Sequence, residues 1–339
     1  MQLPAPNQSS LRLGQTIGKR NSQMFQFRRF TCLLVYAIVV TSPSYGDQPA
    51  DDPLAPILQP VLRPAVEMLL EYDQGQRSYT DADFPMKADR FAAFQREVVT
   101  NLARVLQLED WQVRAPLEKS SPLAGRFIDR TLKTIRHHGI AMEVHVVEFP
   151  QTGQVVPMVI CLPEGDDVRP GSCTLTGHTK HGWRDLVLNL TRYPAGIATQ
   201  LATAGLAAIA VEKVDAGYLS RDGNRGNDEP AIATFRLASG RVTRSHQLMA
   251  CLAASEILAT HPRVDHRRIG ATGVSLGGWL STQTALLSDR IQVVADFGRK
   301  TLLVHDGTTV ENFQGIRDLC HILPGMHGLC ERNLLARAY

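Results

Sequence analysis

The sequence predicts an α/β protein in which a mostly parallel sheet is covered by helices. From residue 140 onward, short apolar runs alternate with longer stretches of helical periodicity. A G-x-S-x-G motif, residues 273–277, also stands between an expected strand and an expected helix. Near-continuous apolar strands are typical of a parallel sheet that is buried on both faces, so the alternation indicates this class.

Each expected element follows from its own pattern. Alternating residues 142–149, the turn 150–153 and the apolar run 155–162 indicate an antiparallel hairpin. The other expected strands are 172–176, 206–211, 268–272 and 291–295, and the expected helices are 194–204, 244–260 and 276–287. Apolar residues at helical spacing predict an N-terminal helical segment within 61–108, and residues 109–139 are expected to be mixed, with another short helix.

The N-terminus is predicted to be a cleavable secretory signal. Arg28 and Arg29 precede an apolar stretch over 30–40, and residues 44–46 supply small side chains before Asp47. The apolar stretch is short for a bilayer span, so no stable membrane span is expected after cleavage. An uncleaved N-terminal anchor is the alternative. We expect an exported protein of bacterial type, periplasmic or extracellular.

The expected organisation has three parts. Residues 1–46 form the signal, of which 1–23 are an artefact of start-site choice if translation begins at Met24. A linker and the helical N-terminal segment follow over 47–139. The main α/β domain covers 140–339 and is expected to be incomplete at its C-terminus.

Charge gives no reason to expect a nucleic-acid partner. Residues 1–46 carry five basic residues and no acidic one, which leaves 31 basic and 33 acidic residues in the rest of the chain. No basic patch stands out. A hydrophobic fraction of 44% and a charged fraction of 20% are ordinary for a globular protein.

The cysteines after the leader show no metal-binding spacing. They are Cys161, Cys173, Cys251, Cys320 and Cys330. Since export permits disulfides, the two pairings close in sequence, Cys161–Cys173 and Cys320–Cys330, are open. Buried free cysteines are the alternative, and no metal site is expected.

Ser275 is the strongest candidate functional residue. A serine at a sharp turn from strand to helix exposes its hydroxyl above the sheet, and this is the context that the G-x-S-x-G motif requires of a nucleophile. Gly273 and Gly277 allow strand and helix to pass closely. The helix N-terminus directs its free N–H groups, beginning with Leu276, to the place where an oxyanion forms.

Two loops are expected to complete the site. In this architecture the second oxyanion donor comes from the loop after the third strand, here 176–183, and the candidate donors are the backbones of His178 and Thr179. A plain connecting loop is the alternative. In the loop after the following strand, Asp215 and Arg221 are candidates to line the pocket, with a solvated loop and local ion pairs as the alternative.

Four segments of the chain resemble a known group of α/β-hydrolases. The runs HPRVDHRRIGATGVSLGG, PEGDDVRPGSCTLTGHTKHG, LATAGLAAIAVEKVDAG and LCHILPGM are similar to acetyl xylan esterase-like and dienelactone hydrolase-like members, over roughly residues 85–335. The resemblance implies the α/β-hydrolase fold and a Ser-His-Asp triad. It also implies a small-molecule or carbohydrate carboxylic ester as substrate, and no metal or organic cofactor.

The chain departs from that family where the triad should be completed. There, the acid follows the next strand after the PGM segment and the histidine follows the last strand, whereas this chain ends at Tyr339. Both partners and the last strands are therefore expected to be absent. Asp306, His321 and His327 are the substitutes within the chain. A serine without a base is a weak nucleophile, so ester hydrolysis is expected to be slower by about 10⁴–10⁶ than in a complete triad.

The sequence thus favours an exported serine carboxylesterase that forms an acyl-enzyme at Ser275. Three alternatives stay open. A peptidase of the same fold would differ in its leaving group. An inactive hydrolase relative would only bind carbohydrate or a partner. A truncated fragment would have no catalytic role.

Overall fold

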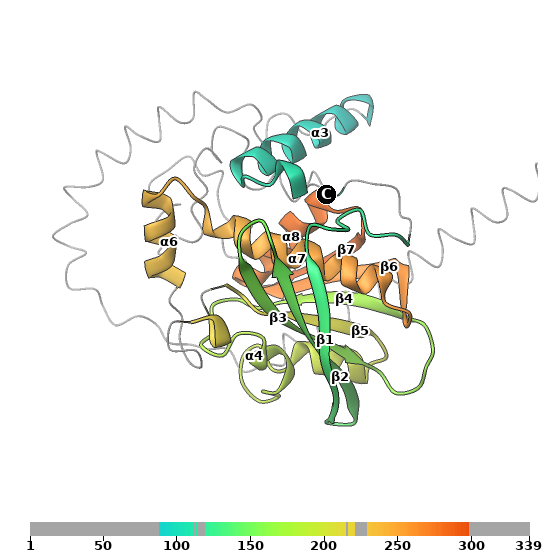
Figure 1. The fold of residues 1–339 in the computed structure, drawn as a ribbon. Helices are drawn as coiled ribbons and strands as arrows, with labels where there is room; N and C mark the ends of the chain where they lie inside the picture. The colour runs from blue at the N-terminus through green and yellow to red at the C-terminus, as the bar shows by residue number, and fades with distance from the viewer. Residues whose placement is uncertain (1–87, 112, 114–118, 215, 221–228, 298–339) are drawn as a thin grey trace, which may run out of the picture.

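The computed structural model describes residues 88–111, 113, 119–214, 216–220 and 229–297. The strands among these residues form one sheet in the order β1-β2-β3-β5-β4-β6-β7 (Figure 1). The strands are β1 (Ile128–His137), β2 (Ile140–Phe149), β3 (Gln154–Leu162), β4 (Arg169–Leu175), β5 (Ala207–Val211), β6 (Val264–Val274) and β7 (Ile291–Phe297). The helices are α3 (Ala88–Val105), η2 (Glu109–Trp111), α4 (Arg184–Val187), α5 (Ile197–Thr203), η3 (Gly217–Leu219), α6 (Glu229–Ala238), α7 (Thr243–Thr260) and α8 (Leu276–Leu287).

The sheet is mixed. Strands β4, β5, β6 and β7 are parallel, while β1, β2 and β3 are joined by antiparallel pairing and β3 runs antiparallel to β5. The predicted α/β class, the hairpin and the strand–helix alternation are confirmed. All five residues of β5 are buried, as its apolar run predicts for a strand covered on both faces.

Side chains of alternate residues pack on opposite faces of the sheet. One apolar cluster joins α3, α7 and α8 to one face, and a second joins α4 and α5 to the other. In β5, Ile209 belongs to the first cluster and Ala208 to the second. In α3, Phe94, Val98 and Leu102 lie buried against the first cluster, which confirms the helical periodicity predicted there.

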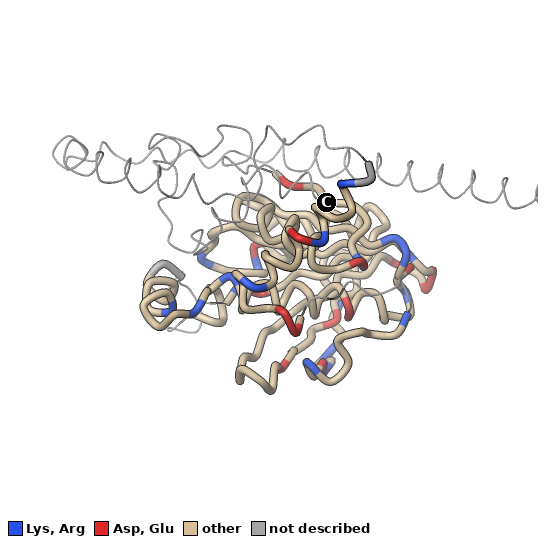
Figure 2. Tube along the Cα trace, turned by 90° about the horizontal axis from the view of Figure 1, so that it is seen from above, with Lys and Arg blue, Asp and Glu red and all other residues tan. Residues whose placement is uncertain are grey.

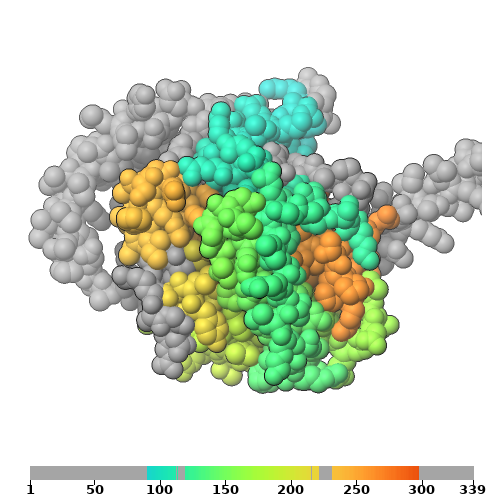
Figure 3. Space-filling view, viewed as in Figure 1, coloured from blue at the N-terminus to red at the C-terminus, as the bar shows by residue number. Residues whose placement is uncertain are grey.

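The strand β1 was not anticipated within the segment 109–139. It pairs with β2, and all ten of its residues are exposed, including Leu132 at 61%. Exposure on both faces removes the alternation of apolar and polar residues that would have revealed a strand. In the space-filling view β1 and β2, coloured green, cross the middle of one face of the molecule (Figure 3). The helix α6 was also not anticipated.

Of the two possibilities left open for Cys161 and Cys173, the disulfide is wrong and the buried free cysteines are confirmed. Cys161, Cys173 and Cys251 are buried free thiols. Cys161 belongs to the cluster beneath α5 and Cys173 to the cluster beneath α7, so the sheet separates these two thiols. Cys320 and Cys330 lie outside the described residues, as do the expected signal and the linker.

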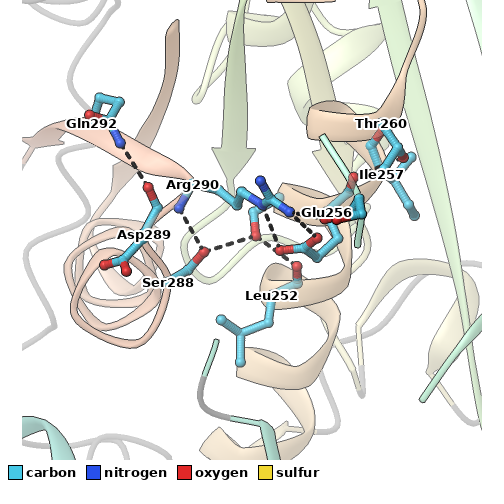
Figure 4. Close-up of polar contacts among 10 residues, drawn as sticks. Leu252, Glu256, Ile257, Thr260, Ser288, Asp289, Arg290 and Gln292 are labelled. Atoms are coloured by element: carbon cyan, nitrogen blue, oxygen red, sulfur yellow. Dashed lines mark hydrogen bonds and ion pairs between the residues drawn. The ribbon is translucent and has the colours of Figure 1, made fainter. Parts of the chain in front are cut away.

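A buried ion pair joins α7 to the turn between α8 and β7. Arg290 Nε and Nη2 donate to the two carboxylate oxygens of Glu256 at 3.0 and 3.1 Å, and both residues are almost completely buried (Figure 4). The backbone N–H of Arg290 also donates to Ser288 Oγ at 3.2 Å. This contact fixes the end of α8 that is remote from Ser275.

Charges of both signs are interspersed along the described chain (Figure 2). Among the described residues, no helix is long and apolar enough to cross a membrane. The same part of the chain contains no group of three or more His, Cys, Asp or Glu side chains that could hold a metal ion.

Candidate active site

Ser275 is the single residue between β6 and α8. Its backbone has φ 58° and ψ −119°, a conformation that non-glycine residues rarely adopt. The turn is held on both sides, because Ser275 N–H donates to Phe297 O at 2.7 Å and Ser275 O accepts from Gly278 N–H at 3.0 Å. The strand, turn and helix predicted around Ser275 are present, and its side chain is half-buried.

Close backbone contacts explain the two glycines of the motif. A methyl group at Gly273 would lie 2.2 Å from the carbonyl of Gly277. A methyl group at Gly277 would lie 2.0 Å from Leu175 O at the end of β4. Only glycine allows backbones to approach so closely. The start of α8 is therefore packed directly onto the end of the neighbouring central strand.

The loop after β4 runs beside the serine. A methyl group at Gly177 would lie 3.1 Å from Ser275 Cβ and 2.8 Å from Val274 O, so this loop and the turn are in contact. His178 is half-buried and Thr179 is buried. Thr179 Oγ1 accepts from Thr176 Oγ1 and donates to Gly182 O, both at 3.5 Å, which closes the loop on itself.

Glu212, at the end of β5, links that loop to the next one. Its carboxylate is 1% exposed and accepts hydrogen bonds from the backbone N–H groups of Trp183, Lys213 and Tyr218 at 3.1, 3.2 and 3.3 Å. Burial raises the pKa of Glu212 to about 8, against the opposing effect of the three N–H groups and of Arg184. No motif in the sequence marked this residue.

An aromatic surface adjoins Glu212. The rings of Trp183 and Tyr218 lie 6.0 Å apart, and the Arg184 guanidinium lies 4.3 Å from the centre of the Tyr218 ring. Tyr218 is 47% exposed. The two rings are tilted by 36° to each other, so the pair forms an angled apolar surface that reaches solvent at Tyr218.

Two further polar side chains, which no sequence motif marked, lie close to the turn at Ser275. Asp296 Oδ1 lies 1.8 Å from where a methyl group at Gly278 would be, and Asp296 Oδ2 accepts from Thr282 Oγ1 at 3.3 Å. The carboxylate therefore packs on the first turns of α8. Tyr193 Oη lies 2.6 Å from where a methyl group at Gly177 would be.

The structure brings Ser275, Leu276, His178 and Thr179 together at the carboxyl ends of β4 and β6. The other candidate residues lie outside the described residues: Asp215, Arg221, Asp306, His321 and His327. Their expected roles stay predictions.

No known protein-family profile and no curated protein matches the chain. Solved structures do. The chain is similar to the crystal structure of a protein assigned as an acetyl xylan esterase from Bacteroides fragilis NCTC 9343, with a TM-score of 0.63 and 14% identity over 81% of this chain and 71% of that one.

Two other esterases are similar with lower scores. Acetyl xylan esterase 1 from Thermoanaerobacterium sp. JW/SL YS485 has a TM-score of 0.42 and 15% identity, over 75% of this chain and 78% of that chain. A glucuronoyl esterase from Solibacter usitatus has a TM-score of 0.38 and 12% identity, over 64% and 59%. The first similarity together with the sheet topology confirms the α/β-hydrolase fold.

Proposed function

We propose that this chain, which has the α/β-hydrolase fold, is a serine carboxylesterase with Ser275 as its nucleophile. The conformation of Ser275 carries the proposal. A non-glycine residue at φ 58° is costly, by about 1–3 kcal/mol, and such strain gathers at functional sites. At this position it places Ser275 between the end of β6 and the N-terminus of α8, the arrangement in which a nucleophilic serine is exposed.

The reaction follows from the groups around the serine. Ser275 Oγ attacks the ester carbonyl, and the negative charge that develops on the carbonyl oxygen is stabilised by backbone N–H groups. The first N–H groups of α8 have no partner within the helix, so Leu276 N–H supports this role, with the backbone of His178 or Thr179 as second donor. The alcohol leaves, and water then hydrolyses the acyl-enzyme.

A general base must take the proton from Ser275 Oγ during the attack. His321 and His327, with Asp306 as the acid, are the candidates within the chain downstream of the serine. A chain in which they cannot serve would keep only the residual activity of the oxyanion site.

We propose a carbohydrate ester, such as an acetylated sugar, as the substrate. The aromatic pair of the half-buried Trp183 and the exposed Tyr218 supports this, because aromatic rings stack against the apolar faces of sugars. The assignment of the Bacteroides fragilis protein as an acetyl xylan esterase agrees with it. The signal-like segment 1–46 supports export, which would give access to such polymers.

The test compares wild type with Ser275→Ala, using the full chain. We expect wild type to react with a fluorophosphonate probe and to hydrolyse p-nitrophenyl acetate, and the variant to do neither. Aminoacyl-p-nitroanilides distinguish a peptidase. Absence of both labelling and turnover in folded wild type would refute the proposal and leave a binding role. Equal labelling of both proteins would remove Ser275 from the mechanism.

A further inference from the structure

Tyr193 lies close to Ser275, although it belongs to a distant segment of the chain. It lies just before α5, on the opposite face of the sheet from α8. A methyl group at Gly177 would lie 2.6 Å from Tyr193 Oη and 3.1 Å from Ser275 Cβ. The tyrosine hydroxyl and the serine therefore both pack close to Gly177, and no side chain at position 177 separates them.

The ring of Tyr193 is anchored, while its hydroxyl is not used inside the protein. The ring packs against the apolar cluster of α4 and α5. Neighbouring hydroxyls are bonded: Thr174 Oγ1 donates to Ile209 O at 2.8 Å and Thr199 Oγ1 to Val187 O at 2.6 Å. Tyr193 Oη makes no hydrogen bond with any residue that the structure describes.

A tyrosine hydroxyl at the end of an anchored ring normally finds a partner. Burial raises the pKa of Tyr193, so the group keeps its proton and remains a donor at physiological pH. Its position beside Ser275 makes the carbonyl oxygen of a bound ester a suitable acceptor.

We propose that the Tyr193 hydroxyl donates a hydrogen bond to the carbonyl oxygen of the substrate at Ser275, as a side-chain member of the oxyanion site. This inference rests on the proposed function. The donor keeps its proton while the π electrons of the carbonyl move onto oxygen, so the hydrogen bond strengthens as negative charge develops. The interaction is made mainly in the transition state and should act on kcat more than on KM.

The test is Tyr193→Phe, which removes one oxygen atom and keeps the packing of the ring. With p-nitrophenyl acetate and Ser275→Ala as background, we expect kcat to fall on the order of 10–100-fold while KM changes by less than about 2-fold. The melting temperature should be unchanged, since no internal hydrogen bond is lost.

Thr199→Val is the matched control, because it also removes a hydroxyl, but one that lies within α5 and is bonded to Val187 O. We expect it to lower the melting temperature and leave kcat unchanged. An unchanged kcat in Tyr193→Phe, with turnover still dependent on Ser275, would overturn this inference alone. Equal loss of kcat in both variants would also overturn it, as an effect of packing. Absence of Ser275-dependent turnover in wild type would overturn it together with the proposed function.

Discussion

Gly182 lies so close to the Glu212 carboxylate that a methyl group at residue 182 would be 1.6 Å from Oε1. Gly182 also has φ +59°, a conformation that favours glycine. The loop after β4, which contains His178 and Thr179, is thus pressed onto a buried carboxylate at its far end. Glu212 therefore sets the path of the loop that supplies the second candidate oxyanion donor.

Gly182→Ala is expected to be far more damaging than Gly165→Ala. Both glycines have positive φ, but nothing lies within 4 Å of a methyl group at Gly165. Gly165→Ala should cost the backbone strain alone, about 1–2 kcal/mol. Gly182→Ala adds a clash with Glu212 and should cost about 3 kcal/mol or more. Urea denaturation of both variants measures the difference, and equal midpoints would contradict the close packing of Gly182 against Glu212.

Glu212→Gln should change how stability depends on pH. Burial raises the pKa of Glu212 from 4.5 to about 8, so between these values the folded chain holds a proton that the unfolded chain has released. The stability of wild type relative to Glu212→Gln should therefore fall as pH rises from about 4.5 to about 8. Denaturation midpoints of both proteins across this range test it. A difference in stability that does not vary with pH would show that folding does not raise the pKa of Glu212.

Patterns of neighbouring residues in the sequence predict most of the strands and helices of the fold. The apolar runs that became β2 to β7 and the spacing in α3 mark elements that are buried. The G-x-S-x-G motif marks the turn because its serine and two glycines lie within five consecutive residues, although the turn also contacts Leu175 and Phe297. By contrast, β1 is exposed on both faces and left no pattern. Glu212 and Tyr193 reach the site through contacts between distant segments, and no spacing within the sequence encodes such contacts.

Ser275→Gly is expected to be more stable than Ser275→Ala. Alanine retains the unfavourable φ of 58°, whereas glycine relieves it. The relief of about 1–3 kcal/mol exceeds the entropic cost of glycine in the unfolded chain, about 0.4–1 kcal/mol. We expect a net gain of about 1 kcal/mol in urea denaturation.

Ser281, inside α8, provides the matched control for this comparison. Its hydroxyl donates to Gly277 O at 2.8 Å, and its backbone is helical. There the order should reverse, with Ser281→Gly less stable than Ser281→Ala by about 1 kcal/mol. Glycine variants that are the less stable at both positions would show that the turn at Ser275 stores no strain.

Asp129→Asn is expected to lower the pKa of His145, which joins β2 to β1. His145 is buried; Nδ1 lies 2.9 Å from Asp129 Oδ1 and Nε2 lies 3.6 Å from Glu143 Oε2. Burial is the largest influence and lowers the pKa, but the hydrogen bond with Asp129 and the charges of Asp129 and Glu143 together raise it above 6.5. Without the Asp129 charge, burial should prevail and bring the pKa below 6.5.

The lower pKa of His145 in Asp129→Asn should also reverse the way in which stability depends on pH. In wild type, protonated His145 stabilises the fold below pH 6.5, and this contribution is lost as pH rises through the raised pKa. In Asp129→Asn, stability should instead be lost as pH falls, since the neutral ring is then preferred in the folded chain. NMR titration of the imidazole signal, assigned with His145→Gln, measures the pKa. A value in Asp129→Asn that stays above 6.5 would show that Glu143, which also contacts His261 Nε2 at 3.1 Å, holds the proton on His145.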